Sequence, residues 1–121
     1  LTQYQQFSEI FWKHPLLGVG PGTYTLALYQ NNSTLPVWRY QPIHNIYLLM
    51  LVEIGLVGFA IVTLLHCYIV TLLIKRNKLF LPILASILIV GLFDHWLWSS
   101  SFGLIFTAVV FGLSLGYRSD K

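Results

Sequence analysis

The chain has 121 residues, of which 56% are hydrophobic and only 9% are charged, and its mean hydropathy is +0.71. Because a soluble domain has about 25% charged residues, this composition excludes an ordinary water-soluble surface and favours a protein embedded in membrane lipid. The net charge of +3 is small, and the sequence has no stripe of Lys or Arg with interleaved aromatic residues, so we expect no nucleic-acid partner.

We expect no targeting segment at the start of the chain. Its first residue is Leu rather than Met, and no basic stretch followed by a short apolar run opens it. These features predict no signal peptide, and we interpret the chain as the C-terminal part of a longer polytopic protein. The single cysteine, Cys67, lies in an apolar run, so we expect neither a disulfide framework nor a paired-cysteine metal site.

Residues 1–43 combine a short helix with an irregular loop. Apolar residues recur at helical spacing in 1–14 with Gln and Glu between them, which predicts an amphipathic helix near a membrane interface. The segment 13–43 is rich in turn formers, with one further short helix expected over 23–30. The glycines that would permit its tight turns and close packing are Gly18, Gly20 and Gly22.

Residues 44–121 form the predicted transmembrane region, with helices over about 44–74, 79–98 and 102–117. At about 1.5 Å of rise per residue, the first two runs are long enough to cross a hydrocarbon core of roughly 30 Å, and the third is the shortest. The expected fold is an all-α membrane protein. It would be a fragment of a polytopic helical bundle, in which about three transmembrane helices follow an outer-face amphipathic helix and a Gly/Pro-rich loop.

Basic residues predict the orientation of this bundle. One basic cluster, Lys75–Lys78, separates the first two apolar runs, and Arg118 and Lys121 follow the third. Because short basic loops stay in the cytoplasm, three crossings place both clusters on that side and residues 1–43 on the outer face. The same topology puts four polar residues at one membrane surface: Arg39, His44, Asp94 and His95.

His44 and Asn45 stand where the loop enters the first apolar run. One interpretation is structural: either residue could cap the helix and contact lipid headgroups, and Asn is a good cap. The other makes His44 a general base or a hydrogen-bond donor to phosphate, because an imidazole titrates near neutral pH. The sequence leaves both interpretations open.

Glu53 is a carboxylate inside the first apolar run, nine residues after His44. In a continuous helix it would lie roughly 13 Å deeper and on a face turned away from His44, so we expect no direct acid–base pair between them. A carboxylate within a membrane usually faces protein or water and marks function by default. The structural alternative is that Glu53 accepts hydrogen bonds from backbone N–H groups of the Gly/Pro loop.

The remaining candidates have weaker signals. The GVGPG segment, 18–22, lacks the lysine and spacing of a phosphate loop, although a nest of N–H groups could bind an anion there. Arg39 suits either bidentate phosphate binding or headgroup anchoring. Asp94 could polarise a second ionisable centre or mark the interface. Gly55 and Gly58 are expected to allow close helix packing.

Two motifs in order give the chain a family resemblance. FWKHPLLGVGPGTY, a polar spacer and HNIYLLMLVEIGLVGFAIV resemble the C-terminal conserved region of the O-antigen ligase and O-antigen polymerase superfamily, over residues 11–59. The later FDHWLW segment fits that region loosely. The ordered combination is specific, whereas either motif alone would be weak.

The resemblance implies a multi-pass glycosyltransferase of the bacterial inner membrane with a periplasmic active face. Such enzymes transfer a glycan from an undecaprenyl-diphosphate carrier to another glycan, to lipid A core or to a protein, without a metal or other cofactor. The histidine of the family motif corresponds to His44, the candidate catalytic base or acceptor-orienting group, and Arg39 is the one candidate here for holding the donor diphosphate. Further arginines of the family would lie upstream.

We assign Asn45 to substrate binding, and structural or supporting roles to Glu53, Asp94 and the three loop glycines. The four histidines show no paired ligand spacing, so we expect no metal site. A rival hypothesis is a non-enzymatic transporter segment or membrane assembly subunit, in which Glu53 would pair helices or line an ion path. The ordered pair of motifs argues against this rival.

Overall fold

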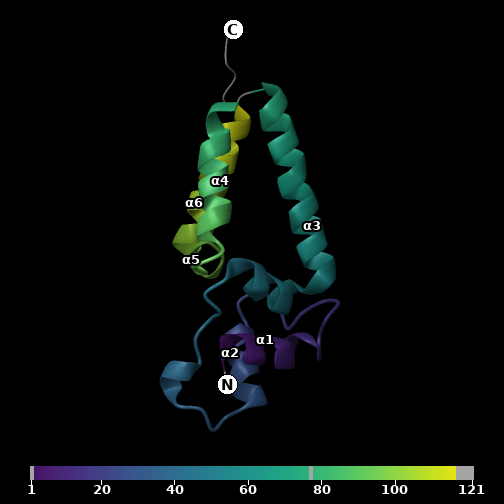
Figure 1. Ribbon diagram of the computed structural model, residues 1–121, viewed down its shortest axis with the longest axis vertical. Coiled ribbons are helices and arrows are strands. Elements are labelled where there is room, and N and C mark those ends of the chain that lie inside the picture. Colours follow the sequence, from purple (N-terminus) through teal and green to yellow (C-terminus); the bar gives the residue numbers. More distant parts are fainter. Residues whose placement is uncertain (1, 77, 117–121) are drawn as a thin grey trace.

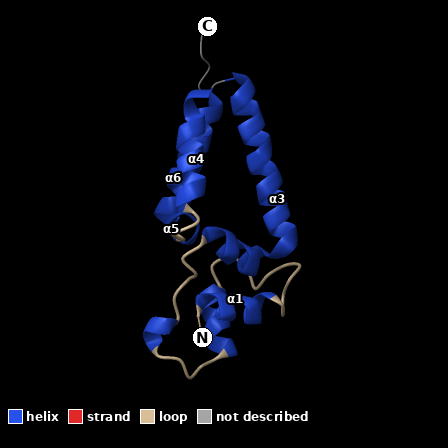
Figure 2. Cartoon of the chain, viewed as in Figure 1, coloured by secondary structure: helices blue, strands red, loops and turns tan. Residues whose placement is uncertain are grey.

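The computed structural model describes residues 2–76 and 78–116, and every regular element within these residues is a helix (Figure 2). This confirms the predicted all-α class. In Figure 1, α4 and α6 lie together beside the long part of α3, and α1 and α2 gather at one end of these helices. The elements in chain order are α1 (Gln3–Phe11), α2 (Tyr24–Asn31), the 3-10 helix η1 (Val37–Arg39), α3 (Ile46–Arg76), the 3-10 helix η2 (Lys78–Phe80), α4 (Leu81–Val90), α5 (Trp96–Ser99) and α6 (Ser101–Gly116).

The helix α1 is the amphipathic helix that the sequence predicts. The Thr2 hydroxyl accepts a hydrogen bond from the Gln5 backbone N–H, and the Gln5 side chain accepts one from the Thr2 backbone N–H. This capping box satisfies two N–H groups that have no partner within the helix. Ile10 and Phe11 are buried on one face, whereas Tyr4 is exposed.

The helices α1 and α2 and the first turns of α3 enclose one hydrophobic core. The expected short helix over 23–30 is confirmed as α2, and it contributes two of the core side chains. Burial of a large apolar side chain typically contributes about 1.5–3 kcal/mol, so this core fixes the segment that leads into α3. Its buried members are Ile10, Phe11, Tyr24, Leu28, Ile43, Leu49 and Val52.

The helix α3 is broken at Gly55, where the sequence predicts one continuous helix over about 44–74. Gly55 has φ 66° and ψ −176°. This backbone conformation lies outside the helical region, and residues other than glycine rarely adopt it. In Figure 1 the first turns of α3 run across the molecule, and the remainder runs along its long axis. The backbone conformation of Gly55 therefore accounts for the change of direction of α3.

The Gly/Pro loop fills this break in α3. The amides of Leu56 and Val57 donate to the carbonyls of Pro15 and Leu16, at 2.9 and 3.1 Å. In the opposite sense, the amide of Val19 donates to Val52 at 2.9 Å and that of Gly20 to Glu53 at 2.8 Å. Backbone groups freed by the break thus find partners in the loop, as buried backbone groups require.

Glycine allows this close approach on both sides. A Cβ atom at Gly55 would lie 2.3 Å from the carbonyl oxygen of Leu16, and one at Gly18 would lie 2.4 Å from that of Glu53. Gly55 therefore does permit close packing, as expected, but its partner is a loop rather than another helix. The PLLGVG segment, 15–20, and the EIG segment, 53–55, are therefore two halves of one structural unit.

Among the described residues, one helix is long and apolar enough to cross a membrane, and it spans Ile46–Lys75. The helices α4 and α6 are apolar but shorter. The predicted run 79–98 is divided into η2, α4, a turn and α5, whereas the run 102–117 corresponds to α6. The three-span bundle and its orientation stay predictions, and Arg118 and Lys121, on which the orientation partly rests, lie outside the described residues.

Candidate functional site

The segments before α3 and between α4 and α5 meet at one end of the bundle. The amide of Ile46 donates to the carbonyl of Gly91 at 2.8 Å, and the Asn45 side-chain amide donates to the carbonyl of Leu92 at 3.2 Å. Gly91 is needed at this crossing, because a Cβ atom there would lie 2.5 Å from a side-chain carbon of Ile46. Two loops that are distant in sequence are therefore held together.

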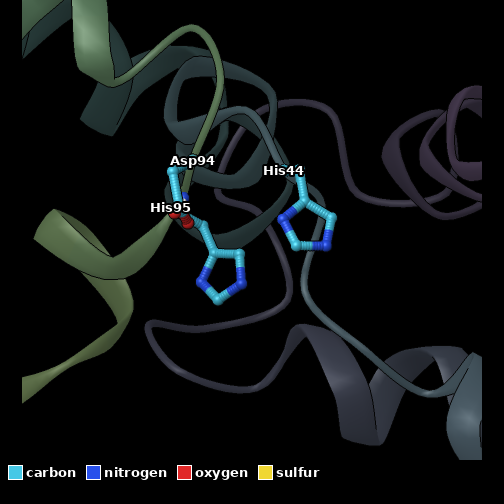
Figure 3. A group of neighbouring side chains, drawn as sticks. All are labelled: His44, Asp94 and His95. Atoms are coloured by element: carbon cyan, nitrogen blue, oxygen red, sulfur yellow. Dashed lines mark hydrogen bonds between the residues drawn. The ribbon is translucent and has the colours of Figure 1, made fainter.

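This crossing brings three ionisable side chains together, which we call the His–Asp cluster: His44, Asp94 and His95 (Figure 3). One side-chain nitrogen or oxygen atom of each lies within 4.8 Å of those of the other two. The His44 and His95 ring centroids are 5.2 Å apart, with the ring planes tilted by 50°. His44 is exposed, and the other two side chains are half-buried.

Hydrogen bonds orient the α5 side of the cluster. An Asp94 carboxylate oxygen accepts the backbone N–H of His95 at 2.6 Å, and Nδ1 of His95 lies 2.7 Å from the Ser99 hydroxyl. Burial lowers the pKa of the His95 imidazole, the Asp94 carboxylate raises it, and His44 lowers it further. Because burial has the largest effect, the neutral imidazole of His95 is favoured relative to an exposed histidine.

Asn45 takes the capping role that the sequence leaves open. Its side-chain oxygen accepts the backbone N–H groups of Tyr47 and Leu48, at 3.0 and 3.1 Å. These are among the first amides of α3, which have no partner within the helix. The cap leaves the preceding residue, His44, at the mouth of the helix; its backbone N–H donates to the Gln3 side chain at 3.4 Å. A substrate contact of Asn45 stays a prediction.

Glu53 is buried and joins the N-terminal region to α5 rather than facing the His–Asp cluster. One carboxylate oxygen accepts the backbone N–H of Tyr24 at 3.3 Å, and the other accepts the indole N–H of Trp98 at 2.7 Å. The sequence left open whether Glu53 accepts N–H groups of the Gly/Pro loop, and the one backbone donor to its carboxylate among the described residues is Tyr24, the first residue of α2, just after that loop. The partnership with Trp98 is not visible in the sequence, where an aromatic residue at a helix end reads as an interface anchor.

The other predicted residues lie in the N-terminal region. Gly18, Gly20 and Gly22 all have positive φ angles, which confirms the predicted turns. Because the amides of Val19 and Gly20 donate to α3 carbonyls, they do not form an open anion-binding nest. Arg39 is exposed at the end of η1, five residues before His44 in the chain.

A cleft of about 400 Å³ between α1 and α2 is a further feature that sequence reasoning missed. Lys13 and Asn31 line this cleft; the Lys13 ammonium group donates to the Asn31 side-chain oxygen, and the Asn31 amide donates to Glu9 at 2.9 Å. Glu9 lies in α1, Lys13 just after it and Asn31 in α2, and the sequence does not specify how the two helices sit, so no spacing signal could have grouped these residues.

A comparison with protein families finds that the family described as O-Antigen ligase matches residues 1–63. This range holds α1, the Gly/Pro loop, α2, His44 and the break in α3, whereas Asp94, His95 and Trp98 lie outside it. No curated protein and no solved structure matches the chain.

Proposed function

Since the chain belongs to the O-antigen ligase family, we propose that it is the part of a membrane glycosyltransferase that activates the acceptor. The enzyme would transfer a glycan from an undecaprenyl-diphosphate carrier at the periplasmic face of the bacterial inner membrane. Members of the family are generally inner-membrane proteins, and α3 is long and apolar enough to cross a membrane. The acceptor would be a growing glycan, lipid A core or a protein.

The observation that carries this proposal is the position of His44. It lies within the residues matched by the family, at the entrance to the apolar helix α3, with an exposed imidazole next to Asp94 and His95. A lipid-linked sugar diphosphate keeps its tail in the bilayer and its reactive carbon at the interface. A catalyst for such a donor needs polar groups at a helix mouth beside apolar surface, which is the environment of His44.

The proposed step uses His44 as general base. Its neutral imidazole takes the proton of the acceptor hydroxyl as the hydroxyl oxygen bonds to the anomeric carbon of the donor glycan. The bond between that carbon and the diphosphate oxygen breaks, and the undecaprenyl diphosphate leaves with the electron pair. Arg39, whose planar guanidinium can hold two phosphate oxygens, would stabilise the departing charge.

Asp94 would assist by stabilising the imidazolium that forms on His44. The aspartate of a catalytic triad likewise stabilises the imidazolium that forms during proton transfer. Its carboxylate is held by the backbone N–H of His95, so its position does not depend on substrate. Asp94 is therefore a positioning and electrostatic residue in this proposal, and His44 is the group that touches the reacting atoms.

The test is His44→Ala in the complete protein, with transfer measured from an undecaprenyl-diphosphate glycan to candidate acceptors. Loss of a general base typically lowers the rate by roughly 10²- to 10⁴-fold. The matched control is His14→Ala, because His14 is an exposed histidine outside the cluster. Near-normal transfer by the His44 variant, at equal membrane abundance, would remove His44 from the mechanism.

The rival function, a transporter segment or assembly subunit, has less support. It needs Glu53 as a helix-pairing or ion-path residue, whereas both carboxylate oxygens of Glu53 accept hydrogen bonds from Tyr24 and Trp98. Flux that depends on Glu53 and on pH, without a requirement for a polyprenyl-linked glycan, would favour the rival.

A further inference from the structure

The His–Asp cluster offers two imidazoles and one carboxylate that converge from two loops. We propose that His44, Asp94 and His95 form a binding site for a divalent transition-metal ion, with Zn²⁺ as the best candidate. The sequence predicts no such site, because the two histidines lie far apart in the chain. The fold supplies the proximity that the spacing does not.

The chemistry of the donors selects the class of ion. Imidazole nitrogens suit Zn²⁺, Cu²⁺ and Ni²⁺, whereas Mg²⁺ and Ca²⁺ prefer a shell of oxygen atoms. Two histidines and one carboxylate are also the protein ligands of many zinc enzymes, in which a water molecule or a substrate takes the fourth position. The exposure of His44 leaves the fourth side of the cluster open to solvent.

The distances are close to those that coordination requires. With Zn–N bonds of about 2.1 Å, the ligand atoms of a tetrahedral site are roughly 3.4 Å apart. The three candidate atoms of the cluster already lie within 4.8 Å of one another. Each pair of ligand atoms would have to approach by at most about 1.4 Å for an ion to bind, and we expect side-chain rotation to supply this movement.

Hydrogen bonds from neighbouring groups orient two of the proposed ligands, His95 and Asp94. Nδ1 of His95 lies 2.7 Å from the Ser99 hydroxyl, which leaves the other ring nitrogen, Nε2, for an ion. One Asp94 oxygen accepts the His95 backbone N–H, so the second oxygen remains for coordination. Such hydrogen bonds fix ring orientation and raise ligand basicity, and they are typical partners of metal ligands.

An ion at this site would inhibit transfer, and this consequence rests on the function proposed above. If Zn²⁺ takes a lone pair of the His44 imidazole, that lone pair no longer accepts the acceptor proton. Transfer would then proceed fully in the presence of a chelator and fall when Zn²⁺ is added. The site is thus a regulatory one, and it requires no metal in the reaction.

The test measures Zn²⁺ binding directly. The complete protein, purified through a tag without histidine and stripped with EDTA, is reconstituted in nanodiscs and titrated with ZnCl₂ by calorimetry. We expect one Zn²⁺ site that is lost, or weakened by roughly tenfold or more, in each of His44→Ala, Asp94→Asn and His95→Ala. The matched control, His14→Ala, should bind Zn²⁺ as the wild type does.

The outcomes separate this proposal from the proposed function. Equal Zn²⁺ affinity in the wild type and in all three variants, or no binding at all, would overturn the metal site. Asp94→Asn guards against misfolding, because it keeps the shape of the side chain, and circular dichroism compares its helix content with that of the wild type. Cluster-dependent Zn²⁺ binding that leaves transfer unaffected would instead uphold the metal site and refute His44 as the base.

Discussion

The indole N–H of Trp98 donates a hydrogen bond of 2.7 Å to the carboxylate of Glu53, which lies 45 residues earlier in the chain. The other carboxylate oxygen accepts the backbone N–H of Tyr24. One buried side chain therefore connects α2, α3 and α5. Through α5, this connection also steadies the loop that carries Asp94 and His95.

We predict that Trp98→Phe destabilises the protein. The substitution keeps the aromatic bulk but removes the donor, and it leaves a buried carboxylate oxygen with one partner fewer. Hydrogen bonds to charged groups contribute about 1.5–3 kcal/mol, so a loss of this size is expected in thermal unfolding of the complete protein in nanodiscs. The control is Trp38→Phe, because Trp38 is exposed. Equal unfolding temperatures for the two variants would contradict the prediction.

Three glycine-to-alanine substitutions should separate strain from steric clash. Gly112 lies in α6 with open space around its Cβ position, so Gly112→Ala should stabilise by about 1 kcal/mol through helix propensity. Gly22 has a positive φ angle but open space, so Gly22→Ala should cost about 1 kcal/mol. Gly55 combines a positive φ with a backbone clash, so Gly55→Ala should cost the most.

The readout for the glycine series is again thermal unfolding, and the order of the three variants is the prediction. If Gly55→Ala were no more harmful than Gly22→Ala, the docking of the loop onto the α3 break would be wrong. That outcome would not contradict the positions of the remaining helices.

Tyr24→Phe should stabilise the protein at neutral pH. The Tyr24 hydroxyl is buried and has no hydrogen-bond partner among the described residues, so its removal should gain about 1 kcal/mol. Burial raises the pKa of this hydroxyl from 10.0 to about 12. Because the unfolded chain releases the proton at the lower pKa, wild-type stability should fall as pH rises from 10 to 12.

The two proteins should therefore diverge further in alkaline solution. Unfolding curves recorded across this pH range should show a steeper loss for the wild type than for Tyr24→Phe. Tyr4→Phe, at an exposed position, serves as the control and should follow the wild type. Parallel curves for the wild type and Tyr24→Phe would show that the hydroxyl is hydrated or bonded in the complete protein.

Arg39→Lys tests the proposed contact with the donor diphosphate. Lys keeps the positive charge but lacks the planar fork that binds two oxygens. Loss of one charge-assisted hydrogen bond, at about 1.5 kcal/mol or more, should raise KM for the undecaprenyl-diphosphate glycan by roughly tenfold or more. Lys75→Arg, at the far end of α3, should leave KM unchanged. An unaltered KM in the Arg39 variant would remove Arg39 from the donor site.

Local signals in the sequence were sufficient for the N-terminal helices. The amphipathic spacing before Trp12 and the turn formers after it predicted α1, the glycine turns and α2, because short-range hydrogen bonding and apolar periodicity determine these elements. The break in α3 was not predicted. An isolated glycine such as Gly55 within an apolar run is usually interpreted as a packing site, and the hydrogen bonds that stabilise the break join residues 33 to 41 positions apart.

The candidate site also combines a residue that the sequence could identify with neighbours that it could not. His44 could be selected from the sequence because it stands alone at the mouth of an apolar run. Its proximity to Asp94 and His95 follows from the contact between Ile46 and Gly91, which is a tertiary interaction without a spacing signature. The topology predicted from the basic residues placed these side chains at one membrane surface, but it could not give the distances between them.

The docking of the Gly/Pro loop onto the broken turn of α3 has a consequence for biosynthesis. Within the described part of the chain, the carbonyls of Pro15 and Leu16 and the amides of Val19 and Gly20 find their backbone partners in residues 52–57. During translation, this loop therefore emerges from the ribosome before residues 52–57, which supply its hydrogen-bond partners. The region formed by α1, the Gly/Pro loop and α2 can therefore complete its hydrogen bonds only after residues 52–57 have been synthesised, so its folding is coupled in time to the synthesis of α3.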